Sequence, residues 1–348
     1  MPLSVEQHTR PEFWCDHCQK PCLAPLPLGL ERGGLVGPNL TALIAFMKGG
    51  CHASFSTIRT FLRDIVGVTL ARSTLANTIA KVSEALNGPY EELVRLLPNE
   101  EVLNIDETGH QCHQERWWTW CLRADLYTLF KIDAHRSADV LMDRVGREFA
   151  GTIGCDYFSA YRRYMRVCGI EVQFCMAHLI RDVKFLTTLP DARTQADGET
   201  LRLALKRLFE VIHRRETLSA TEFDRELKAA RAGVLRAGRE DVPTTRPAQN
   251  MAKRFQQHGE AYFTFVTTPG VAPTNNWAEQ AIRFVVIDRH ITQGTRSETG
   301  RRWSERIWTA IATCAGQGRS AHAFLKECVG NWFAGTPSPS LLPQGATG

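Results

Sequence analysis

The spacing of hydrophobic residues changes twice along the chain, from helical to strand-like and back. Between residues 38 and 98 apolar residues recur every three or four positions, which predicts helices. Residues 101 to 180 hold short aromatic and β-branched runs separated by turn residues, which predict strands. From 186 to about 268 the helical spacing returns in a highly charged segment. Its predicted buried face consists of Leu201, Leu205, Leu208 and Ile212.

The strand-rich region predicts an α/β fold with one mixed sheet. "EVLNID", "RWWTWCLRAD" and "YTLFKIDA" read as an antiparallel meander. A short helix is expected from Ser137, and "GTIGCDYFSAY" and "EVQFCMAHL" are expected to supply two further strands. Three strands followed by helix, strand, helix and strand is an α/β layout.

The first helical region has two interpretations. "FSTIRTFLRDIVGVTLARSTLANTIAKVSEAL" predicts two helices broken near Gly67, with Ser73 or Thr74 capping the second. Two helices joined by a short turn that contains glycine are typical of a helix-turn-helix. A plain helical hairpin explains the same pattern.

Composition narrows the class of protein without naming a function. The 348 residues are 43% hydrophobic and 23% charged, as in ordinary globular proteins. No apolar run approaches the ~20 residues that span a bilayer, and the first residues lack a secretory pattern, so we expect a cytoplasmic protein. Eleven scattered cysteines indicate reduced thiols. The net charge is only +5, but basic residues cluster at 206–216, 288–296 and 300–306, as on a solvated helix face or along a phosphate backbone.

Asp106 and Asp156 are each predicted to end an apolar strand of the same sheet. In "EVLNIDETGHQ" a hydrophobic strand reaches Asp106 and Glu107, and in "IGCDYFSAY" another reaches Asp156. A turn explains the first acid pair when it is taken alone. The carboxyl ends of strands are where ligands gather in an α/β sheet, and two carboxylates there favour a bound cation. Oxygen ligands of this kind suit Mg²⁺ or Mn²⁺.

Glu279 is the candidate third ligand, although its surroundings also fit a helix cap. With Asn276 as N-cap, Glu279 falls at the glutamate position of a capping box. Arg283 lies four residues on, where it would pair with Glu279 or reach a phosphate.

Four motifs together resemble one enzyme family. "NIDETG", "GCDYFSAY", "CMAHLIRD" and "PTNNWAEQAIRFVVIDRHITQGTRSETG" occur in the order and context of the insertion-sequence 66 class of bacterial transposases. The resemblance covers roughly residues 20 to 330. It implies a DDE transposase with a ribonuclease-H-like core, whose acids fall on Asp106, Asp156 and Glu279. Gln280 departs from the family, which usually has a basic residue there.

The resemblance also implies a mechanism and partners. The three acids would hold two Mg²⁺ or Mn²⁺ ions that activate water to cut DNA at the transposon end, and the freed 3′-hydroxyl would attack target DNA. The expected partners are the terminal inverted repeats, target DNA, further copies of the chain in a synaptic complex and accessory proteins of the same element. The expected DNA contacts are Arg283, Arg289, His290, Arg296, Asn275 and Asn276.

The resemblance further divides the chain into segments with expected roles. A remnant of a cysteine-containing zinc module and a linker come first, then a helical DNA-binding region, a catalytic core interrupted by a helical insertion, and a disordered tail. In that order the segments are 1–37, 38–98, 99–185 (core, first part), 186–268 (insertion), 269–334 (core, second part with the glutamate helix) and 335–348.

Cysteine and histidine residues suggest weaker metal sites. Cys15, Cys18 and Cys22 supply one CxxC pair, and a structural zinc site usually needs two, so a decayed zinc ribbon is preferred over an intact one. Cys175 and His178 form a CxxH after a predicted strand, as in several DDE groups, but two ligands do not hold zinc alone.

Other residues leave further alternatives open. His110 and His113 would suit a zinc hydrolase, although their spacing is not a helical HxxxH. The tryptophans at 117, 118 and 120 fit base stacking, but aromatic strands more often belong to a core. A nuclease or resolvase that cuts without joining would share all three acids. A DNA-binding protein that has lost catalysis is the non-enzymatic alternative.

Overall fold

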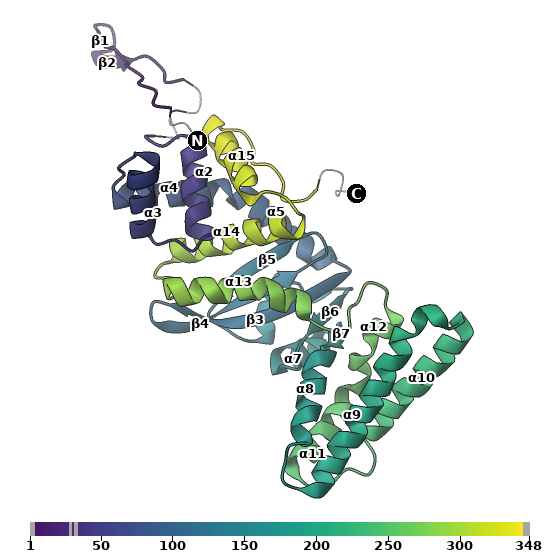
Figure 1. Cartoon of the computed structure of the whole chain (residues 1–348). Coiled ribbons are helices and arrows are strands. Elements are labelled where there is room, and N and C mark those ends of the chain that lie inside the picture. The colour runs from purple at the N-terminus through teal and green to yellow at the C-terminus, as the bar shows by residue number, and fades with distance from the viewer. Residues whose placement is uncertain (1–3, 28–29, 31–33, 344–348) are drawn as a thin grey trace. The chain divides into compact units, whose positions relative to one another are not determined.

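The computed structural model describes residues 4–27, 30 and 34–343, which form two compact units. Unit 1 comprises Met1–Leu97, Glu107–His135 and Ala281–Gly348, and unit 2 comprises Pro98–Asp106 and Arg136–Gln280. Figure 1 shows the helices and strands of both. No helix within the described ranges is long and apolar enough to cross a membrane.

A five-stranded mixed sheet confirms the predicted α/β layout. Its strand order is β5-β4-β3-β6-β7, in which β4 and β5 are antiparallel while β3, β6 and β7 are parallel neighbours. The short helix α6 (Ala138–Arg144) begins after Ser137, as expected. The strands are β3 Val102–Cys112, β4 Glu115–Arg123, β5 Thr128–Asp133, β6 Thr152–Cys155 and β7 Glu171–Phe174.

β3 does not end at the acids, which corrects one sequence-based expectation. The strand continues through Asp106 and Glu107 to Cys112 and turns into β4 through His113 and Gln114. Both turn residues have positive φ, 52° and 66°, as a two-residue type I′ hairpin requires. Such turns usually carry Asn-Gly or Asp-Gly, so His113-Gln114 did not mark the position of this turn.

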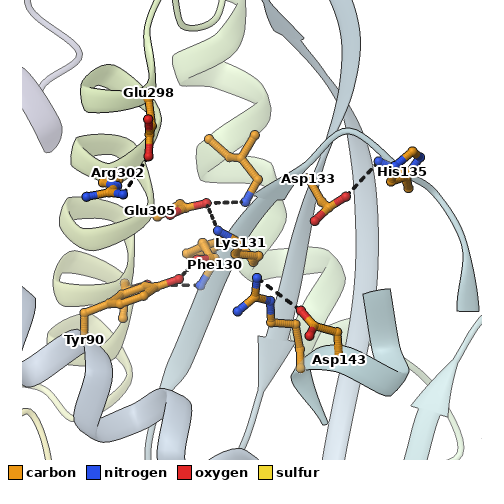
Figure 2. A network of polar contacts seen from close by, with 12 residues as sticks. Tyr90, Phe130, Lys131, Asp133, His135, Asp143, Glu298, Arg302 and Glu305 are labelled. Atoms are coloured by element: carbon orange, nitrogen blue, oxygen red, sulfur yellow. Dashed lines mark hydrogen bonds and ion pairs between the residues drawn. The ribbon is translucent and has the colours of Figure 1, made fainter. Parts of the chain in front are cut away.

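In unit 1, helix α14 (Glu298–Gly316) lies along the edge strand β5. Side chains at three successive i+4 positions of α14 accept backbone N–H groups from alternate residues of β5. Figure 2 shows part of this contact, with Glu305 between the helix and the strand. The three pairs are Glu305 with Ile132 at 2.8 Å, Thr309 with Phe130 at 3.0 Å and Thr313 with Thr128 at 3.1 Å.

The four-residue repeat of α14 matches the two-residue repeat of β5, because four helical residues rise ~6 Å and two strand residues rise ~6.6 Å. The helix therefore satisfies an edge that would otherwise expose unpaired donors. The other helices of unit 1 are α2 Pro38–Gly49, α3 Phe55–Phe61, α4 Arg72–Ala85, α5 Asn87–Leu96, most of α13 Asn276–Thr292, and α15 Ala321–Ala334.

The region from 55 to 85 breaks where the sequence predicted. A π-helical turn, Leu62–Val66, follows α3 and ends at Gly67, whose φ of 78° favours glycine. The predicted caps are wrong, however. The N-cap of α4 is Ala71, whose carbonyl accepts the Leu75 N–H at 3.2 Å, so Ser73 and Thr74 lie inside the first turn.

Unit 2 contains the start of β3, strands β6 and β7, and the helices between and after them. As predicted, Leu201, Leu205 and Leu208 of α9 are buried, but the next buried residue is Val211 and not Ile212. α9 packs against both α8 and α10 (Figure 1). Besides α6, the helices are α7 Ser159–Cys168, α8 Met176–Leu186, α9 Ala192–His213, α10 Ala220–Ala237, α11 Arg246–His258, α12 Thr264–Thr267 and the first turn of α13.

The two ends of the chain differ in packing. Near the N-terminus β1 (Glu12–Cys15) and β2 (Lys20–Leu23) form an exposed antiparallel hairpin. The tail was expected to be disordered, but Leu341 and Leu342 are buried and the Leu341 carbonyl accepts hydrogen bonds from Gln317 and Arg319. That expectation is therefore wrong as far as residue 343, and 344–348 lie outside the described residues.

Candidate functional site

Asp106 and Asp156 lie at the same level of neighbouring parallel strands. β3 and β6 pair with Asn104 opposite Gly154, so the residues two positions further on, Asp106 and Asp156, share a level and a face. Paired strands lie about 4.8 Å apart, so this register, continued past its last pair, sets the two acids opposite each other. A Cβ on Gly154 would lie 2.6 Å from the Asn104 side-chain oxygen, so a larger residue directly below the acids would require that side chain to move.

Cys175 extends this row to the third strand. Cys155 pairs with Phe174 in the β6–β7 ladder, which places Asp156 and Cys175 at one level. The Cys175 N–H donates to the Cys155 carbonyl at 2.8 Å and continues the ladder for one more bond. Three groups that can bind metals therefore stand side by side where the parallel strands end.

Asp156 begins the turn into α7. Its Oδ1 accepts the Phe158 N–H at 2.8 Å, the local bond of an Asx turn, and α7 starts one residue later at Ser159. The bond fixes one carboxylate oxygen, and the half-exposed side chain keeps its second oxygen for a ligand.

Asn275 joins the start of α13 to this strand end. Its Nδ2 donates to the Ile105 carbonyl at 2.8 Å, and its backbone N–H donates to the Cys175 sulfur at 3.3 Å. Its own carbonyl accepts the Glu279 N–H at 3.2 Å, the first bond of the helix. The side chain is 1% exposed, which does not suit the predicted DNA contact, whereas Asn276 is exposed.

The helix start also argues against the capping-box interpretation of Glu279. Because α13 begins at Asn276, its N-cap is Asn275, and Glu279 lies one position beyond the capping-box glutamate. The Glu279 Oε1 is buried and has no hydrogen-bond partner among the described residues.

Cys175, His178 and Glu279 form one cluster. One ligand atom from each lies within 4.8 Å of the other two, and the His178 Nδ1 is 3.6 Å from the Glu279 Oε1, too far for a hydrogen bond. Burial raises the pKa of the Cys175 thiol, but hydrogen bonds from His178 and from the Asn275 N–H outweigh it and lower that pKa. The hydrogen bond to Cys175 raises the pKa of His178.

Buried atoms without partners gather here and fit an ion. They are the Asn275 Oδ1, the His178 Nδ1 and the Glu279 Oε1. Two carboxylate donors, Asp106 and Asp156, suit Mg²⁺ or Mn²⁺, whereas the thiol and imidazole beside Glu279 suit a softer metal. Among the described residues the three acids do not form a group in which every ligand oxygen lies within 4.8 Å of the others.

The predicted DNA contacts on the later part of α13 and just after it lie in unit 1. Arg283, His290 and Arg296 are exposed. Arg289 is half-buried and donates through one Nη to the Thr108 hydroxyl at 3.0 Å and to the Gly109 carbonyl. It therefore connects α13 to β3, and its other N–H groups are the donors available to a phosphate.

The tryptophans and histidines of the hairpin have separate places. Trp120 is fully buried and belongs to the core, which is the alternative the sequence favoured. Trp117 is half-buried beneath the Arg301 guanidinium, 4.2 Å from its ring centre. His110 is buried against the Thr295 hydroxyl at 3.0 Å, while His113 forms the exposed turn. This separation does not support a zinc hydrolase built on the two histidines.

The N-terminal hairpin gathers Cys15, Cys18 and Cys22 in one cluster. Their sulfurs lie within 4.8 Å of one another, so three zinc ligands are present. No fourth histidine, cysteine or acid among the described residues joins them. The Cys18 backbone N–H gives the strongest of the hydrogen bonds that lower the pKa of Cys15, which favours a thiolate.

Sequence reasoning found the acids but missed how they are connected. It treated Asn275 as a cap or DNA contact and placed Cys175 and His178 apart from Glu279. A CxxH directly after a strand, together with the asparagine pair that precedes the glutamate helix, was the available signal. The cluster joins residues about a hundred positions apart, which local patterns do not connect.

Comparison with known proteins agrees with these motifs. The model of the Transposase IS66 family matches residues 33–302. The uncharacterized protein y4hP of Sinorhizobium fredii (strain NBRC 101917 / NGR234) is 25% identical over 355 residues, a match that covers 90% of this chain. The chain spans 62% of that relative's length. From the match along most of its length, the chain belongs to the IS66 transposase family.

Proposed function

We propose that this protein is a DDE transposase that cuts DNA at the ends of an insertion sequence and joins those ends to target DNA. The observation that carries the proposal is the shared level of Asp106 and Asp156, with the Glu279 helix tied to the same strand end through Asn275. Family membership supports the same activity.

In this proposal the five strands form a ribonuclease-H-like core, made of segments 99–185 and 269–334. Segment 186–268 is the helical insertion between them, and 38–98 is a DNA-binding region. The mixed sheet, the helices of 192–258 and the family match from residue 33 support these assignments.

The acids have separate tasks in the reaction. Asp106 and Asp156 from the sheet and Glu279 from the helix would be the ligands of the metal ions. Mg²⁺ or Mn²⁺ bound there supplies an activated water and neutralises charge on the phosphate. Water adds to the phosphorus at the transposon end and the bond to the 3′ oxygen breaks, leaving a 3′-hydroxyl and a 5′-phosphate. That hydroxyl then displaces a 3′ oxygen in target DNA, so one phosphodiester replaces another.

The proposed partners follow from this chemistry. They are the terminal inverted repeats, the target DNA, at least one further copy of the chain to pair two ends, and accessory proteins of the same element. Arg283, His290, Arg296 and Asn276 are the proposed backbone contacts, because all four are exposed.

The test is nicking of labelled element-end DNA in the presence of Mg²⁺. Wild type should release a 3′-hydroxyl end, and Asp106→Asn should lose at least ~100-fold of that rate because a metal ligand is missing. Glu101→Gln removes an exposed acid five residues earlier and should leave the rate unchanged. Equal nicking by wild type and Asp106→Asn would rule out the site, and binding without nicking by wild type would favour a DNA-binding protein that has lost catalysis.

A further inference from the structure

A basic pocket lies in unit 2 beside the turn that follows Asp156. It has a volume of about 390 Å³ and is lined by residues of α7, the start of α6 and the end of α11. Four of its lining residues are arginines, and no carboxylate is among them. The arginines are Arg136, Arg162, Arg163 and Arg166.

Aromatic rings next to Asp156 hold two of these arginines in place. The Arg136 guanidinium lies 3.7 Å from the centre of the Phe158 ring, and that of Arg162 lies 4.5 Å from the Tyr157 ring. Tyr157 and Phe158 directly follow Asp156, whose carboxylate bonds the Phe158 N–H. Asp156 is thus only three residues from Ser159, the first residue of α7 and one that lines the pocket, and these residues span at most ~11 Å.

The positive charge of the pocket is only partly offset. Arg163 lies 3.7 Å from the Asp139 carboxylate, whereas Arg162 and Arg166 have no carboxylate within 4.0 Å among the described residues. Two buried atoms of residues that line the pocket have no hydrogen-bond partner among the described residues. They are the Arg162 Nε and the His258 Nδ1. Burial lowers the pKa of His258, and the charges of Arg162 and Arg166 lower it further, which agrees with a site that disfavours another cation.

We propose that this arginine pocket binds backbone phosphates of the DNA strand that enters the Asp106–Asp156 site. Arg162 and Arg166, which have no carboxylate within 4.0 Å among the described residues, suit phosphate oxygens, which accept paired hydrogen bonds from arginine. The edge of the pocket at Ser159 lies within ~11 Å of Asp156, about three nucleotides of rise at 3.4 Å per nucleotide, so a strand at the acids would pass close to the pocket. This inference rests on the proposed function, because it assumes that DNA reaches the acids.

The test measures DNA binding alone, in EDTA and without cleavage, as a function of salt. Each phosphate contact contributes ~0.9 to the slope of log K against log salt, so Arg162→Gln with Arg166→Gln should lower the slope by ~1.8. Between 50 and 200 mM salt, wild type should therefore lose ~12-fold more affinity than the double variant. Arg193→Gln with Arg225→Gln, two exposed arginines of α9 and α10, should leave the slope unchanged.

Two further variants guard against a folding defect, because Arg162 also packs on Tyr157. Arg162→Lys keeps the charge and should keep the slope, and Arg166→Gln alone should lower it by ~0.9. An unchanged slope in the folded double variant, or equal losses in the α9–α10 control, would overturn the proposal.

Small anions are the other source of phosphate for such a pocket. Calorimetry measures the binding of inorganic pyrophosphate to wild type and to the double variant. If only wild type binds it and the DNA slope is the same in both, the pocket is a small-anion site and the proposal is overturned. The outcome is independent of catalysis. If the double variant lowers the slope but wild type does not nick DNA, the transposase activity is rejected and the phosphate-binding role of the pocket is retained. If wild type nicks DNA but the slope is unchanged in the double variant, the activity is retained and the role of the pocket is rejected.

Discussion

A single buried asparagine connects the three parts of the candidate site. Asn275 bonds the carbonyl that precedes Asp106, the sulfur of Cys175 and, through its carbonyl, the N–H of Glu279. Buried amides that make such bonds are costly to remove, because the groups they satisfied stay buried without partners. The position of the glutamate relative to the strand end therefore depends on this one residue.

We expect Asn275→Ala to lower the free energy of unfolding by about 2 kcal/mol, since the Ile105 carbonyl would lose its donor. Asn276→Ala, one residue later and exposed, should change it by less than about 0.5 kcal/mol. Urea unfolding of both variants checks this, and equal effects would contradict the role of Asn275.

Glu279→Gln separates a metal ligand from a structural glutamate. The substitution keeps size and polarity, so nicking should fall at least ~100-fold while the unfolding free energy changes by less than about 1 kcal/mol. Gln280→Ala on the same turn is the matched control and should retain nicking. A Glu279→Gln variant that is destabilised but still nicks DNA would show that the glutamate only supports the helix.

His110 makes the stability of unit 1 depend on pH. Burial, with the charges of Arg289 and Arg301, lowers its pKa to about 4, below the ordinary value of 6.5. In this range the unfolded state binds the extra proton, so the contribution is full above pH 6.5 and is lost as pH falls towards 4. A shift of that size corresponds to roughly 3 kcal/mol.

The expected result is that His110→Gln loses less stability than wild type between pH 6.5 and 4, as measured by urea unfolding at each pH. His290→Gln removes an exposed histidine of the same unit and should follow the wild-type curve. Identical pH dependence in wild type and His110→Gln would mean that other groups cause the loss.

At the scale of elements, α14 protects the sheet edge by matching its repeat to that of β5. Glu305 serves two donors, the Ile132 N–H and the Lys131 ammonium at 2.9 Å, and its side chain is only 6% exposed (Figure 2). Glu298, on the same helix, pairs with Arg302 in solvent. Because Glu305 is buried and Glu298 is exposed, Glu305 should contribute more to the free energy of unfolding.

Glu305→Ala should lower the unfolding free energy by about 3 kcal/mol, because it leaves a buried N–H and a partly buried ammonium without an acceptor. Glu298→Ala should cost less than about 1 kcal/mol, as exposed ion pairs do. Denaturant unfolding measures both, and a similar cost for the two would show that α14 does not depend on its bonds to β5.

The sequence predicted the elements of this fold better than their connections. Periodicity identified the meander, α6 and the buried face of α9, because these depend on local patterning. It ended β3 too early, since the His113–Gln114 turn lacks the usual glycine, and it misplaced the cap of α4. The α14–β5 contact joins segments more than 170 residues apart and leaves no local signal.

For the candidate site, too, the sequence predicted local features better than tertiary contacts. Asp106 and Asp156 could be found because each comes directly after an apolar run, and the parallel register then sets them on paired strands. The buried role of Asn275 and the arginine pocket depend on burial and tertiary packing. Neither quantity can be read from spacing along the chain.

At the scale of the whole molecule, the family match covers both segments that carry the acids and the helical segment between them. We propose that acids from two strands and one helix act as metal ligands in the site where DNA ends are joined. Loss of activity in a variant does not by itself distinguish a ligand from a supporting residue. A change of metal preference does, because a thiolate ligand disfavours Mg²⁺ more strongly than it disfavours Mn²⁺.

The most direct test is the joining of pre-cut element ends to plasmid DNA by Asp156→Cys, in Mg²⁺ and in Mn²⁺. Wild type should join ends with either ion. Asp156→Cys should lose joining in Mg²⁺ and regain part of it in Mn²⁺. Joining by Asp156→Cys in Mg²⁺ at the wild-type rate would contradict the assignment of Asp156 as a metal ligand.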